Sequence, residues 1–164
     1  MDEDELEGRW EAAVEDGSPE AMERWAAAGD EAVRYLKDVL ESGVPITRGA
    51  GGMAMRDVID NTTEAVARLA SAAPQAFLDA FNQPQWWSHP LVVEGFGTMD
   101  RPEVVGPLLA ALRSDDWGRR ASAARCLTGH AGDERVRAEL ARVQEHDPHQ
   151  LVRYWAEHAL QSGQ

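Results

Sequence analysis

Residues 115–127 read DDWGRRASAARCL, in which two acids precede two arginines and a run of small side chains ends in leucine. Residues 147–160 read DPHQLVRYWAEHAL and repeat this order of acid, arginine, alanines and leucine. Four positions match at one constant spacing: Arg120, Ala123, Cys126 and Leu127 return as Arg153, Ala156, Ala159 and Leu160. A fixed spacing of this size indicates a chain made of repeated structural units.

The residues that precede each of these two stretches repeat as well. Glu103, Val105, Leu109 and Leu112 return, again at a constant spacing, as Glu134, Val136, Leu140 and Val143. Strand signals are sparse and the apolar residues stand at helical spacing, so one unit is predicted to be a helical hairpin of about 30 residues. Its alanines allow a neighbouring helix to approach closely. One hairpin buries only part of its apolar surface, and the units are therefore expected to stack.

This pattern resembles the short HEAT-like repeats of bacterial proteins. The resemblance is good over 86–161 and plausible at 18–41. It is poor at 42–73, where the unit is too long and its break too rich in glycine. The family usually places valine before the arginine, which Val152 satisfies and Arg119 does not.

The resemblance implies an all-α fold, a short right-handed α-solenoid of stacked antiparallel helical hairpins that forms a single domain over 1–164. In such repeats the arginine commonly pairs with an acid in a neighbouring loop. Arg120 and Arg153 are therefore expected to be structural ladder residues. The family pattern says much about the fold and little about function.

Outside the best-matching repeats, the chain has acidic helices over 1–43 and a glycine-rich stretch, VPITRGAGG, at 44–52. This stretch lacks the Gly-Lys-Ser/Thr of a phosphate-binding loop, so we interpret it as a flexible connection, with a partner-binding loop as the alternative. Ser18 and Asp30 are predicted to cap the two helices of a hairpin. Further helices are expected at 4–15, 53–72 and 74–83, with hairpins at 88–115 and 116–147 and an unpaired helix at 147–164.

The net charge of −13 is concentrated at one end of the chain. Residues 1–41 hold 14 acids and four bases, whereas 42–164 hold 15 acids and 12 bases. Such a chain repels phosphate backbones, which argues against a nucleic-acid partner and favours a basic protein partner. An acidic surface that only keeps the protein soluble is the alternative. No apolar run reaches the length of a membrane span and no signal peptide is recognised, so a cytoplasmic protein without membrane contact is expected.

The sequence contains no recognisable catalytic or metal-binding motif. His146 and His149 flank a turn, but a zinc site needs two further ligands nearby, so we expect a surface or capping role and no metal. Cys126, the single cysteine, lies among small residues and is expected to be buried and inert. We therefore expect no enzyme activity and no cofactor.

The tryptophans and arginines supply the candidate binding residues. Trp10, Trp25 and Trp155 stand at helical spacing and are predicted to be core, while Trp117 is expected to pack on the preceding hairpin. The adjacent pair Trp86 and Trp87 cannot both be buried easily, and exposed tryptophans often anchor interfaces. The candidate partner-binding residues are Trp86, Trp87, Arg119, Arg137 and Arg142; a solvated face of ion pairs is the alternative for the arginines.

Taken together, these features favour a non-catalytic protein–protein interaction module, an adaptor or scaffold that presents a curved helical surface. One alternative is an acidic inhibitor or immunity-type protein that neutralises a basic partner. A second is an enzyme of the HEAT-like type, a bilin lyase or a DNA glycosylase, and a third is a self-assembling structural subunit.

Overall fold

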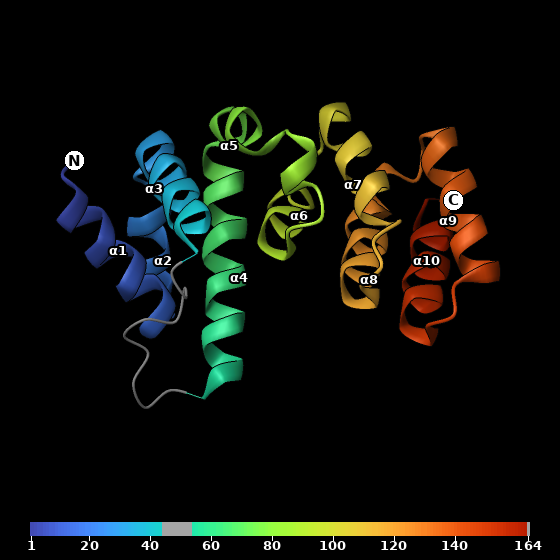
Figure 1. Ribbon diagram of the computed structural model, residues 1–164, viewed down its shortest axis with the longest axis horizontal. Coiled ribbons are helices and arrows are strands. Elements are labelled where there is room, and N and C mark those ends of the chain that lie inside the picture. Colours follow the sequence, from blue (N-terminus) through green and yellow to red (C-terminus); the bar gives the residue numbers. More distant parts are fainter. Residues whose placement is uncertain (44–53, 164) are drawn as a thin grey trace. The chain divides into compact units, whose positions relative to one another are not determined.

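The computed structural model describes residues 1–43 and 54–163 (Figure 1). Within these ranges the secondary structure is helical, and the predicted all-α fold is confirmed. The chain divides into two compact units, Met1–Phe81 and Asn82–Gln164, here called unit 1 and unit 2. The predicted glycine-rich stretch at 44–52 lies outside the described residues, and a single domain over 1–164 stays a prediction.

Unit 1 is built from helices of very different length. They are α1 (Glu3–Glu15), α2 (Pro19–Ala26), α3 (Gly29–Ser42), α4 (Met55–Ala72) and α5 (Pro74–Phe81). Helix α2 contacts both α1 and α4, and α3 contacts α5. The indole rings of Trp10 and Trp25 lie 5.0 Å apart in the core between α1 and α2. Both side chains are buried, as the sequence predicted.

The helix starts of unit 1 confirm one predicted cap and correct the other. The Ser18 side chain accepts a hydrogen bond from the backbone N–H of Ala21, and Pro19 opens α2. Asp30, however, does not cap α3; it lies inside the first turn of that helix, which begins at Gly29. Gly29 has a positive φ, a left-handed conformation that glycine adopts without strain. The chain therefore enters α3 through a tight turn at this glycine, and no side chain caps the helix.

Unit 2 contains the best-matching repeats. Its helices are η1 (Pro84–Trp86), α6 (Pro90–Phe96), η2 (Pro102–Val104), α7 (Val105–Ala111), α8 (Trp117–Cys126), η3 (Leu127–His130), α9 (Glu134–His146) and α10 (Gln150–Ser162). Helix α8 contacts α6 on one side and α10 on the other, so these three helices form one layer. The alanines that the repeat predicted at the contacts are fully buried: Ala123, Ala124, Ala156 and Ala159.

The pairing of helices into hairpins differs from the sequence prediction. The sequence suggested a hairpin at 116–147 and an unpaired helix after it. Instead, α7 pairs with α8 and α9 pairs with α10. The reason is the length of the connections: the turns within each pair are short, whereas η3 and the residues after it separate α8 from α9. Each repeat therefore ends with the helix that carries the ladder arginine.

Cys126 lies in the contact between α8 and α6. Its sulfur approaches the carbonyl oxygen of Val93 at 3.7 Å. A methyl group added at Gly97 would overlap that sulfur, so the glycine permits the close approach of the two helices. Burial raises the pKa of the thiol to about 12, with a further contribution from Glu94. The thiol is thus protonated and packed at neutral pH, the inert state expected from the sequence.

Candidate functional site

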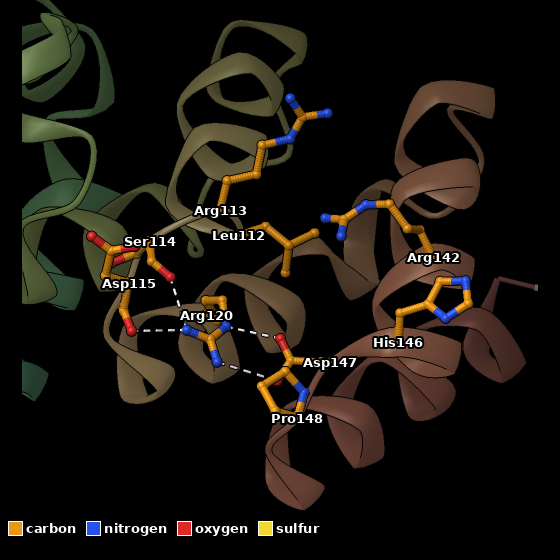
Figure 2. Close-up of a pocket in the computed structure, with 9 residues that line it drawn as sticks. All are labelled: Leu112, Arg113, Ser114, Asp115, Arg120, Arg142, His146, Asp147 and Pro148. Atoms are coloured by element: carbon orange, nitrogen blue, oxygen red, sulfur yellow. Dashed lines mark hydrogen bonds and ion pairs between the residues drawn. The ribbon is translucent and has the colours of Figure 1, made fainter.

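Arg120 of α8 joins the two hairpins of unit 2 (Figure 2). Its Nε and Nη2 atoms donate to the two carboxylate oxygens of Asp147 at 2.8 and 3.2 Å. Its Nη1 atom donates to the carbonyl oxygens of Ser114 and Asp115 at 2.9 and 3.0 Å. The guanidinium therefore uses its donors on the two turns that flank it. We call Arg120 and Asp147 the ladder pair.

The ladder pair is shielded from solvent, since the side chains are 14% and 6% exposed. Burial alone raises the pKa of Asp147, but the hydrogen bonds from Arg120 and from the backbone N–H of His149 outweigh it, and the net pKa is lowered. The carboxylate is consequently ionised at neutral pH. A charged, bidentate pair of this kind fixes the register of one hairpin on the next.

A cavity of about 690 Å³ opens beside the ladder pair, between the α7–α8 and α9–α10 turns. Its cationic side chains already have carboxylate partners. Arg113 and Arg142 both donate to Glu139, at 2.7 and 3.1 Å, and His146 lies 3.6 Å from Glu145. The hydrogen bond from Arg113 is the leading cause that lowers the pKa of Glu139. The cavity thus has no surplus positive charge with which to attract an anionic ligand.

Two other arginines bond to their own loops. Arg153 Nη1 donates to the carbonyl oxygen of Asp147 at 2.6 Å, and Arg137 Nε donates to that of Ala131 at 3.4 Å. Each acceptor lies six residues before its arginine, as Ser114 does for Arg120. Arg137, a candidate binding residue in the sequence, therefore closes the loop ahead of α9.

The remaining sequence candidates gather around the start of α6. Trp86 is 8% exposed, its ring lies 5.8 Å from that of His89, and Trp87 is half-buried. Burial lowers the pKa of His89, and the charge of Arg119 lowers it further. The structure thus places the largely covered Trp86 against His89, and Arg119 is close enough for its charge to act on His89. Arg137 and Arg142 lie apart from them on α9.

The most exposed aromatic side chains of unit 2 lie on α8 and α10. Trp117 is 47% exposed and stacks on His149 with ring centroids 3.9 Å apart and planes at 5°. Leu151 and Tyr154 are 40% and 54% exposed. The prediction that Trp117 packs on the preceding hairpin is wrong, because His149 of the following turn provides the flat surface it contacts.

Helix α10 continues this exposed surface along one side. Leu151, Tyr154, Trp155 and His158 stand at positions i, i+3, i+4 and i+7, which share one side of a helix. The rings of Tyr154, Trp155 and His158 contact each other, with centroids 5.3 to 6.4 Å apart. We call this surface the aromatic face; it consists of Trp117, His149, Leu151, Tyr154, Trp155 and His158.

Trp155 was predicted to be core and is half-exposed instead. The opposite side of α10 is formed by Val152, Ala156 and Ala159, which are all fully buried. Because α10 packs tightly through small residues, no space remains there for an indole ring. The signal for the aromatic face was present in the sequence as a second apolar stripe on the same helix. Only the packing shows which of the two stripes faces inward.

His149 has a structural role as well as an exposed ring. It is the N-cap of α10, and its Nδ1 accepts a hydrogen bond from the backbone N–H of Leu151 at 3.3 Å. The capping role expected from the sequence is therefore confirmed. Within residues 1–43 and 54–163, no group of three or more His, Cys, Asp or Glu side chains is placed to hold a metal ion. None of the helices in these ranges is long and apolar enough to cross a bilayer.

A family model for HEAT repeats matches residues 74–161. The matched range contains every residue of the ladder pair and of the aromatic face, and it also includes α5. No curated protein and no solved structure matches the chain. HEAT repeats generally mediate protein–protein interactions and are generally scaffolds rather than enzymes.

Proposed function

The chain belongs to the HEAT-repeat family, and from this premise we propose that it is a non-catalytic interaction module that binds a protein partner through the aromatic face. The observation that carries the proposal is the grouping of exposed aromatic rings on α8 and α10. Trp117, Leu151 and Tyr154 are each at least 40% exposed in unit 2. Apolar surface gathered in this way is typical of protein-binding sites.

The residue types of the aromatic face suit a binding role. Tryptophan and tyrosine bury large areas and lose little conformational entropy, and they are enriched among the residues that dominate binding energy. The rings of Trp117 and Tyr154 are already held by contacts with His149 and His158. Side chains ordered before binding lose less freedom when a partner arrives.

Arg119 lies near His89, on another side of α8 from Trp117, and is a second candidate contact outside the aromatic face. Arg119 of α8 is half-buried, and no carboxylate within the described residues forms an ion pair with its guanidinium. Arginine is enriched in protein interfaces. We propose Arg119 as a separate contact for the partner, as the sequence suggested. Trp86 is largely buried, so its proposed role is to support His89 through their ring contact rather than to touch the partner directly.

The proposal is tested by quantitative capture of partners from the source cell, with the full chain as bait. A Trp117→Ala/Tyr154→Ala variant is expected to lose the proteins that the wild type retains. The matched control is Met55→Ala/Ile59→Ala, which removes the two exposed apolar side chains at the start of α4. Equal recovery of the same proteins by the wild type and the aromatic variant would show that the binding surface lies elsewhere.

A second candidate function, neutralisation of a basic partner, is favoured by α1. Its acidic side chains, Glu3, Asp4, Glu5, Glu7, Glu11 and Glu15, are exposed. Arg9, the one base of this helix, already bonds to Glu5 and to the carbonyl oxygen of Arg24. If α1 binds the basic partner, Glu7→Gln/Glu11→Gln slows association with the captured partner and makes the association rate less dependent on salt. The variant Trp117→Ala/Tyr154→Ala then leaves the association rate unchanged.

A further inference from the structure

Arg153 of α10 is the counterpart of Arg120 of α8, and the two guanidinium groups share one contact. Each donates through Nη1 to the carbonyl oxygen six residues earlier, at 2.6 Å for Arg153 and 2.9 Å for Arg120. Arg120 uses its other edge to hold the carboxylate of Asp147. Within the residues that the structure describes, no carboxylate meets the corresponding edge of Arg153. That edge is available for a bidentate acceptor.

The side of α10 next to Arg153 is also uncovered. On α8, Ala121 and Ala124 are 5% and 0% exposed. Their counterparts in the next repeat are Tyr154, which is 54% exposed, and Glu157, which is exposed. Helix α10 therefore offers solvent the surface that α8 buries, with an arginine at its edge.

Asp16, in the turn between α1 and α2, matches the other half of the ladder pair. It stands three residues before Pro19, the first residue of α2, just as Asp147 stands three residues before Gln150, the first residue of α10. Each carboxylate accepts a hydrogen bond from the residue two positions later, Ser18 or His149. Asp147 meets an arginine, whereas no cation within the described residues forms an ion pair with Asp16.

We propose that Arg153 of one copy of this chain pairs with Asp16 of a second copy, in a head-to-tail contact between α10 and the α1–α2 turn. The contact reproduces between copies the arginine–aspartate pair that joins the two hairpins within unit 2. Exposed acids on both sides of Asp16, Glu15 and Glu20, make that turn attractive to a guanidinium. Because the two surfaces are different, the contact is heterologous, and each copy can use both surfaces at once to form an open chain or a closed ring.

The net charge of −13 sets the conditions of this association. Like-charged copies repel at long range, and at physiological ionic strength that repulsion is screened beyond about 8 Å. The arginine–aspartate contact acts at hydrogen-bond distance and persists under the same conditions. Self-association is therefore expected at physiological salt and is weaker in dilute buffer.

The test is the mass of the purified full chain by sedimentation velocity at physiological salt, over a wide range of concentration. Asp16→Arg and Arg153→Asp are each expected to raise the dissociation constant by about tenfold or more, because each places two like charges in contact. An equimolar mixture of the two variants is expected to associate again, since the acid introduced in one variant meets the base introduced in the other, and the unchanged pair forms at the next contact. The charge-matched controls are Asp38→Arg and Arg56→Asp, whose side chains are exposed on other helices, α3 and α4.

A monomeric wild type at every concentration would overturn the proposal, as would single variants that associate like the wild type or a mixture that stays dissociated. Circular dichroism and thermal melting verify that each variant is folded. If Arg153→Asp lowers Tm, the test uses Arg153→Gln, which removes the charge and retains a donor for the Asp147 carbonyl. This variant is expected to weaken association without lowering Tm. Trp117→Ala leaves the sedimentation unchanged, so loss of the proposed partner and loss of self-association are distinguished.

Discussion

At the scale of single residues, the chain uses polar side chains mainly to hold its own turns. Arg120, Arg137 and Arg153 each bond to a carbonyl oxygen six residues earlier, and His149 caps the helix that follows it. Such bonds satisfy backbone groups that would otherwise be left unpaired at the turns. A few of these side chains keep donor atoms that these bonds do not use, such as those of Arg153, and these atoms can bind other molecules.

His89 provides a prediction at this scale. Burial lowers its pKa below the value of 6.5 that it has when unfolded, and Arg119 adds to the shift. Between these two pKa values the unfolded chain binds the proton and the folded chain does not, so this contribution to stability is complete above the unfolded value and declines as the pH falls through it. We expect the urea concentration at the midpoint of unfolding to decrease as the pH is lowered from about 7.5 to about 5.5.

The variant His89→Gln isolates this effect. It keeps a polar side chain of similar reach without the titration, so its urea midpoint should vary less over the same pH range. His158→Gln, which changes an exposed histidine of α10, is the matched control and should retain the pH dependence of the wild type. A His89 variant as pH-dependent as the wild type would refute the assignment.

At the scale of helices and hairpins, the ladder pair connects α8 to the turn before α10. Both side chains are shielded, so removing one leaves the other buried without its partner. Such a loss costs more than the pair itself contributes. The pair therefore sets the register between the two hairpins, while the alanine contacts between α8 and α10 supply the buried apolar surface.

Double-mutant analysis measures this connection. We expect Arg120→Ala to lower the free energy of unfolding by about 3 kcal/mol. The coupling between Arg120→Ala and Asp147→Asn should be about 1 to 3 kcal/mol, since the two residues contact each other directly. The exposed pair of Arg135 and Asp133 is the control, and Arg135→Ala should leave the free energy of unfolding nearly unchanged, because water screens an exposed ion pair. Additive effects of the two ladder variants in chemical denaturation would contradict this interpretation.

At the scale of the whole molecule, charge is the dominant feature. The chain carries a net charge of −13, and 14 of its 29 acids lie within residues 1–41. Many of these acids lie on α1, where they are exposed and close to each other. Repulsion among these like charges opposes the compact state.

Thermal melting at different salt concentrations tests the effect of this charge on stability. We expect Tm to rise with sodium chloride, because screening weakens the repulsion. The variant Glu7→Lys/Glu11→Lys, which reverses two exposed charges of α1, should raise Tm in dilute buffer and reduce the gain from added salt. A wild type whose Tm is independent of salt would show that the repulsion has no net effect on folding.

The sequence by itself determined the helical fold and the repeat. The spacing of apolar residues reports helices directly, and the recurrence of Arg120 and Ala123 at Arg153 and Ala156 reports units that stack in the same way. It also indicated the buried Trp10 and Trp25 and the inert Cys126, because these stand in apolar or small-residue surroundings on their own helices.

Tertiary structure alone decided which helices pair, which side of α10 faces inward and where the exposed rings lie. Local spacing shows that α10 has two apolar stripes, but the choice between them depends on the neighbouring helix, which accommodates Val152 and Ala156 and leaves Trp155 half-exposed. The stacking of Trp117 on His149 and the contact of Arg120 with Asp147 both join residues of different hairpins. Such contacts depend on the relative placement of whole hairpins, which the helical periodicity of each segment does not encode.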